Sequence, residues 1–452
     1  MTDRSEVLTE TFMAEIREKN PGEDLFLQAV EEIARDVITV EKANADYAAA
    51  KILARLAEPD RMIQFRITWP DDAGNVQINR GWRVQHSNAV GPYKGGLRFA
   101  STVTPSVLKF LGFEQTFKNA LTGLNLGGAK GGSDFEPKDH TEREIMRFCH
   151  AFMAELQYHI GPSRDIPAGD IGVGTREIGH LFSAWKKHNL DFAGVITGKS
   201  LCIGGSQLRV EATGYGLIYF LCAMLDAAGE DVQGKRIVIS GMGNVAMHAA
   251  RKACALGARV VSLSDTSGLL EAPDGMTNAA LDWIEARKAM KETISEPPKD
   301  LGLKYHPGGT PWGIECDVAL PCATQNEVGE GDARAIVAAG CGFLAEGANM
   351  PLTSDAQKLV RDSSMRYAPG KIANAGGVAV SGLEMSQNAT FRPLSASEVD
   401  DTLRDIMVRV HKTVRDEAAT DQTRGPGIDY RRAANRAAYR RVAEALLDHG
   451  VL

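Results

Sequence analysis

The sequence predicts an α/β protein of two domains, a substrate domain with a mixed sheet flanked by helices and a doubly wound parallel sheet domain, with a cleft between them. The chain has 452 residues, 44% of them apolar, which is enough for more than one core because single domains usually span ~100–200 residues. Residues 61–98 alternate apolar and polar side chains, as strands do. From residue 236 onward, short apolar strands alternate with helical segments, which is the pattern of a doubly wound sheet. These strands are expected at residues 236–240, 259–264, 317–320, 342–345 and 365–368.

The first domain is expected to begin with helices. Phe26, Val30, Ile33 and Val37 recur at helical spacing, so they should form a buried stripe against the first domain or between subunits. The strands of residues 61–98 follow, and they place Lys94 in a turn after a strand.

A further helix is expected to start at Thr104 and Pro105, because threonine is a good N-cap and proline suits the first helical position. The glycine-rich stretch 198–216 should carry the chain into the second domain. The predicted domains are therefore 1–205, completed by 426–452, and 206–425. The turn at residues 424–427 is expected to mark the return, with the final helix rejoining the first domain.

Composition excludes several classes of function. The formal charge is −7, from 51 basic and 58 acidic side chains that are intermixed, so no basic stripe is present that would bind nucleic acid or an anionic membrane. Seven scattered cysteines without a C-x-x-C spacing indicate reduced thiols. The polar start has no apolar leader, and no run reaches the ~18 apolar residues of a membrane span. A cytoplasmic location is the expectation.

Three lysines carry most of the chemical information. Lys94 and Lys130 each lie among glycines, and Lys118 lies on the helix predicted to start at Thr104. Glycine lets a backbone approach its surroundings closely, so these lysines are better placed for a cleft than for a solvated surface. Three cations in one pocket favour an anion with more than one carboxylate. Gln115, three residues before Lys118, shares its helix face and can bind the same ligand group.

Asp170 lies in a loop with three glycines, in the stretch PAGDIGVG. An Asx turn would explain an aspartate there. Beside a lysine cluster, however, it becomes a candidate proton carrier, because a lysine crowded by cations and partly desolvated has a lowered pKa suited to acid/base chemistry.

A dinucleotide site is predicted where residues 241–246 read G-x-G-x-x-A between a strand and a helix. The first glycine makes the turn, the second admits the pyrophosphate, and the helix amides receive its charge. This makes the second domain Rossmann-like. Asp265 ends the next strand, where an acidic side chain normally binds the ribose of NAD. The neighbouring Thr266, with Arg287 or Lys288, would instead suit the 2′-phosphate of NADP, so the residues alone leave the cofactor open.

Further polar residues follow other predicted strands and should line the nucleotide cleft, since ligands of open α/β sheets bind at the carboxyl ends of strands. For the asparagines, a role in stabilising a turn is the alternative. These residues are Ala323, Thr324, Asn349 and Asn374.

Six segments together resemble the hexameric glutamate dehydrogenases along essentially the whole chain. Segments 240–244 and 264–268 look most like the NADP-preferring bacterial and fungal members. The six segments are 91–99 (GPYKGGLRF), 113–120 (FEQTFKNA), 127–132 (GGAKGG), 167–170 (PAGD), 211–216 (EATGYG) and 374–382 (NAGGVAVSG).

The resemblance implies reversible reductive amination of 2-oxoglutarate with ammonia to L-glutamate by hydride transfer from NADPH, in a cytoplasmic homo-oligomer, a hexamer in this family. Lys118 and Gln115 would hold the α-carboxylate. Lys94 and Ser381 would hold the distal carboxylate, with Gly96 also in contact with substrate.

The resemblance also implies that Lys130 is the catalytic amine and that Asp170 moves protons to and from the nitrogen. For the 2′-phosphate, Lys288 is the better alignment and Arg287 its rival. The implied cofactor contacts are Arg209, Thr213, Ser240, Gly241, Gly243, Asn244, Val245, Asp265, Thr266, Lys288, Ala323, Thr324, Asn349 and Asn374.

Several alternatives stay open. One is an NAD-dependent glutamate dehydrogenase. Another is a dehydrogenase of monocarboxylic amino acids, although such enzymes have an apolar residue where this chain has Lys94. A nucleotide-binding sensor without chemistry and a pyridoxal enzyme using Lys130 are more distant. No histidine spacing indicates a metal site, and His86 is expected to be structural.

Overall fold

The computed structural model describes residues 4–420 and 428–450, which form two compact units. The first unit takes in the chain up to Gln207, Val380–Val399 and the chain from Asn435 onward, and the second takes in Leu208–Ala379 and Asp400–Ala434. The sequence pattern placed residues 380–399 in the second domain, and the contacts place them in the first. Residues 428–434 were expected in the first domain and lie in the second unit. The predicted return at residues 424–427 lies outside the described residues.

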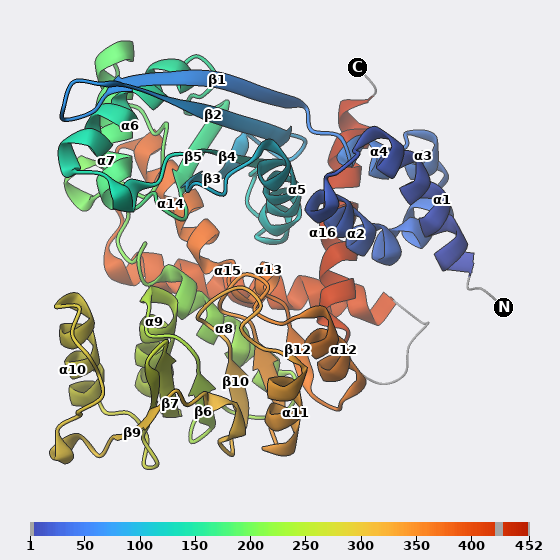
Figure 1. Ribbon diagram of the computed structural model, residues 1–452. Helices are drawn as coiled ribbons and strands as arrows, with labels where there is room; N and C mark the ends of the chain where they lie inside the picture. Colours follow the sequence, from blue (N-terminus) through green and yellow to red (C-terminus); the bar gives the residue numbers. More distant parts are fainter. Residues whose placement is uncertain (1–3, 421–427, 451–452) are drawn as a thin grey trace. The chain divides into compact units, whose positions relative to one another are not determined.

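The sheet of the first unit is mixed, as predicted. Its strands are β1 (Arg61–Pro70), β2 (Val76–Ser87), β3 (Tyr93–Phe99), β4 (Gly128–Ser133) and β5 (Asp165–Gly169), in the order β1-β2-β4-β3-β5 (Figure 1). β2 pairs antiparallel with β1 and β4, whereas β3 runs parallel to β4 and β5.

Lys94 lies within strand β3, so its predicted position in a turn was wrong. Glycines in β3 and in the neighbouring β4 are strand residues that permit close packing. A Cβ on Gly95 would lie 1.6 Å from the carbonyl oxygen of Ala129, and one on Gly128 would lie 2.0 Å from the hydroxyl oxygen of Thr116. Glycine therefore marks places where another backbone or helix touches the strand, which from sequence alone looks like a turn.

Helices cover both faces of this sheet. α6 (Glu142–Leu156) and α7 (Thr175–Asn189) pack with Phe99 and other apolar side chains into one core. α5 (Pro105–Leu121) lies on the opposite face. Its N-cap is Thr104, whose hydroxyl accepts from the amide of Val107 at 3.3 Å, which confirms the predicted helix start.

The second N-terminal helix packs on α5, and side chains of the N-terminal helices contact the last helix, α16 (Tyr430–His449). The predicted apolar stripe is buried in α2 (Asp24–Ala43), where Phe26 meets Phe113 of α5 with ring centroids 5.9 Å apart. Asn435 of α16 donates to Asp36 of α2 at 2.7 Å. The other helices of this region are α1 (Arg4–Lys19), α3 (Ala45–Ala49) and α4 (Ile52–Leu56).

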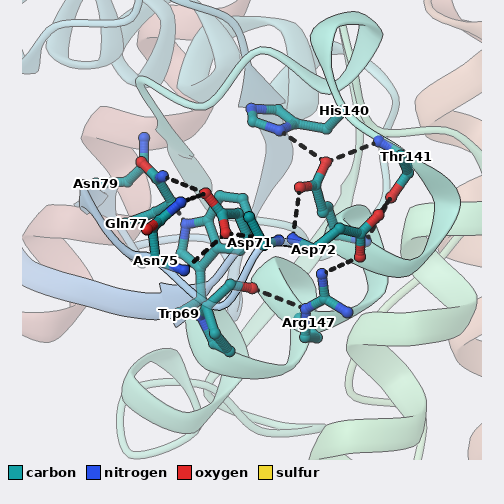
Figure 2. A network of polar contacts seen from close by, with 12 residues as sticks. Trp69, Asp71, Asp72, Asn75, Gln77, Asn79, His140, Thr141 and Arg147 are labelled. Atoms are coloured by element: carbon teal, nitrogen blue, oxygen red, sulfur yellow. Dashed lines mark hydrogen bonds and ion pairs between the residues drawn. The ribbon is translucent and has the colours of Figure 1, made fainter.

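Polar contacts fix the β1–β2 turn to the start of α6 (Figure 2). Asp71 accepts from the backbone amide of Asn75 at 2.8 Å. Asp72 accepts from Thr141, the N-cap of α6, at 2.7 Å, and from Arg147 at 2.6 Å. The hydrogen bond from Arg147 is the main reason why the pKa of Asp72 is lowered. The hairpin is thus held by groups that stay ionised at neutral pH.

The second unit contains the predicted doubly wound sheet, extended at one edge. Its order is β12-β11-β10-β6-β7-β8-β9; β12 to β7 are parallel, and β8 and β9 are antiparallel. The edge pair was not predicted, because β9 is short and mostly exposed. The strands are β6 (Arg236–Ile239), β7 (Arg259–Asp265), β8 (Gly268–Glu271), β9 (Lys304–Pro307), β10 (Val318–Leu320), β11 (Phe343–Ala345) and β12 (Arg366–Ala368).

Among the described helices of the second unit, α8 to α12 are interspersed with these strands, whereas α13, α14 and α15 follow β12. α14 begins in this unit and continues into the first, and α15 returns from the first unit to the second. The helices are α8 (Ala212–Asp226), α9 (Asn244–Ala255), α10 (Asn278–Ala289), α11 (Glu330–Ala338), α12 (Ser354–Asp362), α13 (Gly370–Ala373), α14 (Gly376–Thr390) and α15 (Ala396–Thr420). Short 3₁₀ turns lie at Pro137–Asp139, Leu201–Ile203, Lys299–Leu301 and Pro311–Gly313.

A buried ion pair explains why residues 380–399 join the first unit. Lys199 Nζ lies 2.7 Å from Glu384 Oε1 on α14, with side chains 1% and 0% exposed. The amine also donates to Asn388 at 2.8 Å. The second carboxylate oxygen of Glu384 accepts from the amide of Gly198 at 2.9 Å. One carboxylate therefore holds the loop before residue 200 to α14.

Lys199→Met is expected to lower the free energy of unfolding by about 3–5 kcal/mol, because it leaves the carboxylate of Glu384 buried without its cation. Lys199→Met combined with Glu384→Gln should recover most of this loss, since no buried charge remains. Urea unfolding of the two variants and the parent protein measures the difference. Equal stability of the single variant and the parent would contradict the importance of the pair.

Candidate active site

Five chemically important positions share one face of the first sheet. Leu97 of β3 pairs with Gly131 of β4 and with Gly169 of β5. Because side chains alternate along a strand, this register puts one set of residues together on the face covered by α5. The set is Lys94, Gly96, Arg98, Lys130 and Asp170.

Asp170 holds two cations on a single carboxylate oxygen. Its Oδ2 lies 2.8 Å from Lys130 Nζ and 2.8 Å from Arg98 Nε. The side chain of Lys130 is 7% exposed, and those of Asp170 and Arg98 are each 20% exposed. The group is thus nearly withdrawn from water but retains an opening on one side.

Burial and neighbouring charges set the protonation of this group. Burial lowers the pKa of Lys130, and the positive charge of Arg98 lowers it further, against the opposing effect of Asp170. Burial works against ionisation of Asp170, but the charges of Lys130 and Arg98 outweigh it and lower the pKa of the carboxyl to about 2. A lysine with a lowered pKa beside a permanent carboxylate is suited to acid/base chemistry.

Gly96 makes the close approach possible. A Cβ at this position would lie 2.9 Å from the Cβ of Asp170 and 3.3 Å from Lys130 Nζ. A side chain here would push the two reactive groups apart. The predicted role of Gly96 in contacting substrate is untested, but the structure shows why the position suits glycine.

Lys94 is 1% exposed, and its Nζ donates to the hydroxyl oxygen of Thr197 at 2.8 Å. Thr197 is itself fully buried, and its amide donates to Pro167 at 2.9 Å. Ser381 is buried on α14, three residues before Glu384. The clamp between Glu384 and the loop of residues 196–199 therefore fixes the segments that carry Thr197 and Ser381.

Helix α5 brings Gln115 next to strand β3. Its Cγ lies 3.4 Å from the point that a Cβ on Gly95 would occupy, and its amide donates to Asn119 at 2.6 Å. Asn119 in turn donates to the carbonyl oxygen of Lys94 at 3.0 Å. Lys118 is half-buried, three residues beyond Gln115 on this helix. The predicted helix face and strand face thus adjoin.

Sequence reasoning missed three polar residues that complete the site. Arg98 lies in the segment 91–99, and its spacing of two residues from Gly96 was the signal that both lie on the same face of the strand. Thr197 and Glu384 gave no usable signal, because their partners lie far away in the chain. His86 is structural as expected: its ring bonds the carbonyl oxygen of Leu56 at 2.8 Å, and burial lowers its pKa to about 4.

The second unit forms the predicted strand, glycine turn and helix. Gly241 follows β6 with φ +86°, a conformation that favours glycine. Gly243 is the N-cap of α9 and is exposed, and a Cβ there would meet nothing within 4 Å. Asn244, exposed, and Val245, half-buried, begin the helix. Ser240 accepts from the amide of Cys322 at 2.9 Å, which ties this turn to the loop after β10.

Lys288 and Asp265 form an ion pair at the end of β7. Lys288 Nζ lies 2.8 Å from Asp265 Oδ2, and Asp265 Oδ1 accepts from the amide of Ser267 at 2.8 Å. The rival Arg287 instead pairs with Glu292 at 2.6 Å. Of the two candidate cations, the structure brings Lys288 to the strand end.

The remaining predicted cofactor residues lie at two places in this unit. Asn374 is buried and donates to Asn349 at 3.0 Å, so it also stabilises the loop after β11, as the alternative interpretation held. Thr213 and Arg209 both lie beside Gly377, whose Cβ would be 2.7 Å from the Thr213 hydroxyl. The predicted residues that are exposed in the strand-end loops are Thr266, Ala323, Thr324 and Asn349.

The described parts of the chain contain neither a cluster of metal ligands nor a helix able to span a membrane. Within residues 4–420 and 428–450, no three histidine, cysteine, aspartate or glutamate side chains gather as metal ligands would. No helix in these ranges has the length and apolar character needed to cross a bilayer.

Comparison with known proteins agrees with both units. Residues 204–450 match the family described as Glutamate/Leucine/Phenylalanine/Valine dehydrogenase, and residues 59–187 match Glu/Leu/Phe/Val dehydrogenase, dimerisation domain. The NADP-specific glutamate dehydrogenase of Psychrobacter sp. (strain TAD1) is 49% identical, with 94% of this chain and 96% of that protein covered. The NAD-specific glutamate dehydrogenase of Bacteroides fragilis (strain YCH46) is 47% identical, with 98% of this chain and 99% of that protein covered.

A crystal structure of Plasmodium falciparum glutamate dehydrogenase is also similar. It superposes with a TM-score of 0.94 at 43% sequence identity, covering 99% of this chain and 96% of that one. The fold class predicted from the sequence is therefore confirmed, and so is the family resemblance. The chain belongs to the Glu/Leu/Phe/Val dehydrogenase family.

Proposed function

We propose that this protein is an NADP-dependent glutamate dehydrogenase, which catalyses the reversible reductive amination of 2-oxoglutarate with ammonia to L-glutamate. The observation that carries the proposal is the sheet face on which Asp170 holds Lys130, with the buried cation of Lys94 on the same face. High identity to curated glutamate dehydrogenases over nearly the whole chain supports it.

The substrate would be bound at both ends. Lys94 and Ser381 would bind the distal carboxylate, and Lys118 and Gln115 would bind the α-carboxylate. Lys94 costs free energy to bury, and a carboxylate arriving beside it would offset part of that cost. Holding both ends of a diacid places its central carbon in a defined position, which is how binding lowers the entropic barrier to reaction.

Lys130 and Asp170 would carry out the proton transfers. The amine of Lys130 would polarise the substrate carbonyl and take or give the proton of the water that leaves or enters at the imine stage. Asp170 would move protons to and from the substrate nitrogen. Both groups lie within hydrogen-bond distance of each other, so one proton can pass between them without further movement.

The residues of the second unit fit a dinucleotide. The open space at Gly243 and the exposed start of α9 would receive the pyrophosphate, and the bound cofactor would supply the hydride. Lys288 compensates the charge of Asp265 and would bind a 2′-phosphate together with the hydroxyl of Thr266. Asp265 alone would favour the ribose of NAD, so use of NAD as a second cofactor is part of the proposal.

The alternatives are less well supported. A dehydrogenase of monocarboxylic amino acids would not need a buried cation at Lys94. A nucleotide-binding sensor would not need the contact between Lys130 and Asp170. We further propose a cytoplasmic homo-hexamer, because a match to a dimerisation domain supports a homo-oligomer and the resembled family is hexameric. Nucleic acid and membranes are not proposed partners.

Lys94→Leu is expected to lower kcat/KM for 2-oxoglutarate at least tenfold more than kcat/KM for 2-oxopentanoate, which has no distal carboxylate. The physical reason is that one charged hydrogen bond is worth about 1.5–3 kcal/mol. Initial rates with NADPH and ammonium measure both substrates. Equal losses on the two oxoacids would remove Lys94 from the substrate site.

Asp170→Asn should bind substrate and cofactor normally and turn over at least a hundredfold more slowly, because general acid–base catalysis typically contributes 10²–10⁴-fold. Calorimetric titration measures binding, and steady-state rates measure turnover. Turnover close to that of the parent protein would show that Asp170 is not the proton carrier.

Lys288→Met is expected to lower kcat/KM for NADPH about tenfold or more while leaving NADH within a factor of two to three, because an ion pair to a phosphate is lost and NADH has no 2′-phosphate. Arg287→Met is the matched control, since Arg287 pairs with Glu292, and it should leave both cofactors unaffected. Parallel rates with NADPH and NADH give the result. A larger effect in Arg287→Met than in Lys288→Met would reverse the assignment.

A further inference from the structure

Arg98 has no role in the binding scheme above, yet it contacts the same carboxylate oxygen as Lys130. Its Nε lies 2.8 Å from Asp170 Oδ2, the distance at which Lys130 Nζ lies from that atom. Arg98 is two residues from Gly96 on β3, so the strand directs its side chain to the reactive face. An arginine in a partly desolvated site keeps its proton at any physiological pH.

We propose that Arg98 is a positioning residue that keeps Asp170 ionised and aimed at Lys130, so that the lysine is the member of the pair that gains and loses the proton. The proposal rests on the roles proposed above for Lys130 and Asp170. It concerns a residue that acts through Asp170 rather than on the substrate itself.

The reason lies in what happens when Lys130 gives up its proton. With Lys130 and Asp170 alone, loss of the proton from the amine would leave a carboxylate with no cation in a site that is mostly withdrawn from water. Such a carboxylate is costly and would bind a proton in its turn. The fixed charge of Arg98 removes that cost, so the carboxylate remains an acceptor in both states of the lysine.

The other charged groups near Asp170 are largely compensated among themselves. The loop after β4 carries Glu136 and Lys138, which lie 3.6 Å apart. The start of α7 carries Arg176 and Glu177, which are also paired. These four residues line a surface hollow together with Asp170.

A buried pair lies on the other face of the sheet. Arg83 bonds Asp165 there, with Arg83 Nε 2.9 Å from Asp165 Oδ2. Arg83 lowers the pKa of Lys130 less than Arg98 does. Arg98 is therefore the cation whose removal changes the reactive pair most.

The sign of the expected effect follows directly. Removing a cation raises the pKa of a neighbouring amine and also that of a neighbouring carboxyl. Both changes move the point at which Lys130 becomes neutral, or Asp170 becomes ionised, to higher pH. The low-pH limb of glutamate oxidation, which requires these groups as bases, should therefore move to higher pH.

The experiment compares Arg98→Gln with Arg98→Lys and with the control Arg147→Gln. Arg147 also forms an ion pair with an aspartate, Asp72, but this pair lies in the hairpin network of Figure 2. The first readout is kcat/KM for glutamate against pH with NADP⁺. The second, in the free protein, is the rate at which trinitrobenzenesulfonate labels Lys130 at each pH, measured by peptide mass spectrometry.

Arg98→Gln is expected to move both midpoints up by about 1 pH unit, whereas Arg98→Lys and Arg147→Gln should keep them within ~0.3 unit of the parent protein. Arg98→Met takes the place of Arg98→Gln if the latter does not fold. Unchanged midpoints in the neutral variant would overturn the proposal. So would a raised KM for glutamate with no pH shift, which would make Arg98 a substrate ligand.

The two readouts separate this inference from the proposed function. If Asp170→Asn turns over normally, the catalytic roles fail, but labelling of Lys130 still reports whether Arg98 controls the state of the amine. If Asp170→Asn is slow and the Arg98 variants show no shift, the inference alone fails.

Discussion

The first unit is organised around buried positive charge that must be compensated. Lys94, Lys130 and Lys199 are each buried, and a buried ammonium without partners costs several kcal/mol. Each amine therefore has an oxygen within about 3 Å: Thr197 for Lys94, Asp170 for Lys130 and Glu384 for Lys199. The segments that carry Thr197, Asp170 and Glu384 are far apart in the chain, and the fold of this unit brings each of these oxygens to its amine.

The sheet provides the rigidity that this arrangement requires. On the face opposite Lys130, Arg83 bonds Asp165 of β5 and donates to the carbonyl oxygen of Gly95 in β3 at 3.1 Å. Gln85 donates to the same aspartate at 3.0 Å. The strands that carry the reactive residues are thus tied together through side chains as well as backbone bonds. Preorganised charges of this kind lose little free energy to reorganisation during a reaction.

Much of this could be predicted from the sequence because the signals were local. The turn at Gly241, the helix start at Thr104 and the apolar stripe containing Phe26 each depend on residues close together in the chain, and each was found where expected. The five parallel strands of the second unit were also predicted, since buried strands are short apolar runs.

The failures share a physical cause, which is contact between distant segments. Lys94 was placed in a turn, because a glycine that admits another backbone looks the same in sequence as a glycine with positive φ. Residues 380–399 were assigned to the wrong unit, because the ion pair between Lys199 and Glu384 spans almost two hundred residues of chain.

The glycines of β3 and β4 limit how this protein can change. At Gly95 and Gly128 any larger residue would overlap atoms that belong to a neighbouring strand or to α5, so nearly every codon change there should be purged by selection. In the substrate scheme proposed above, substrate range would diversify through side chains such as Lys94 and Thr197, whose replacement leaves the strand spacing intact. A library for laboratory evolution would therefore hold the glycines constant and randomise the polar positions around them.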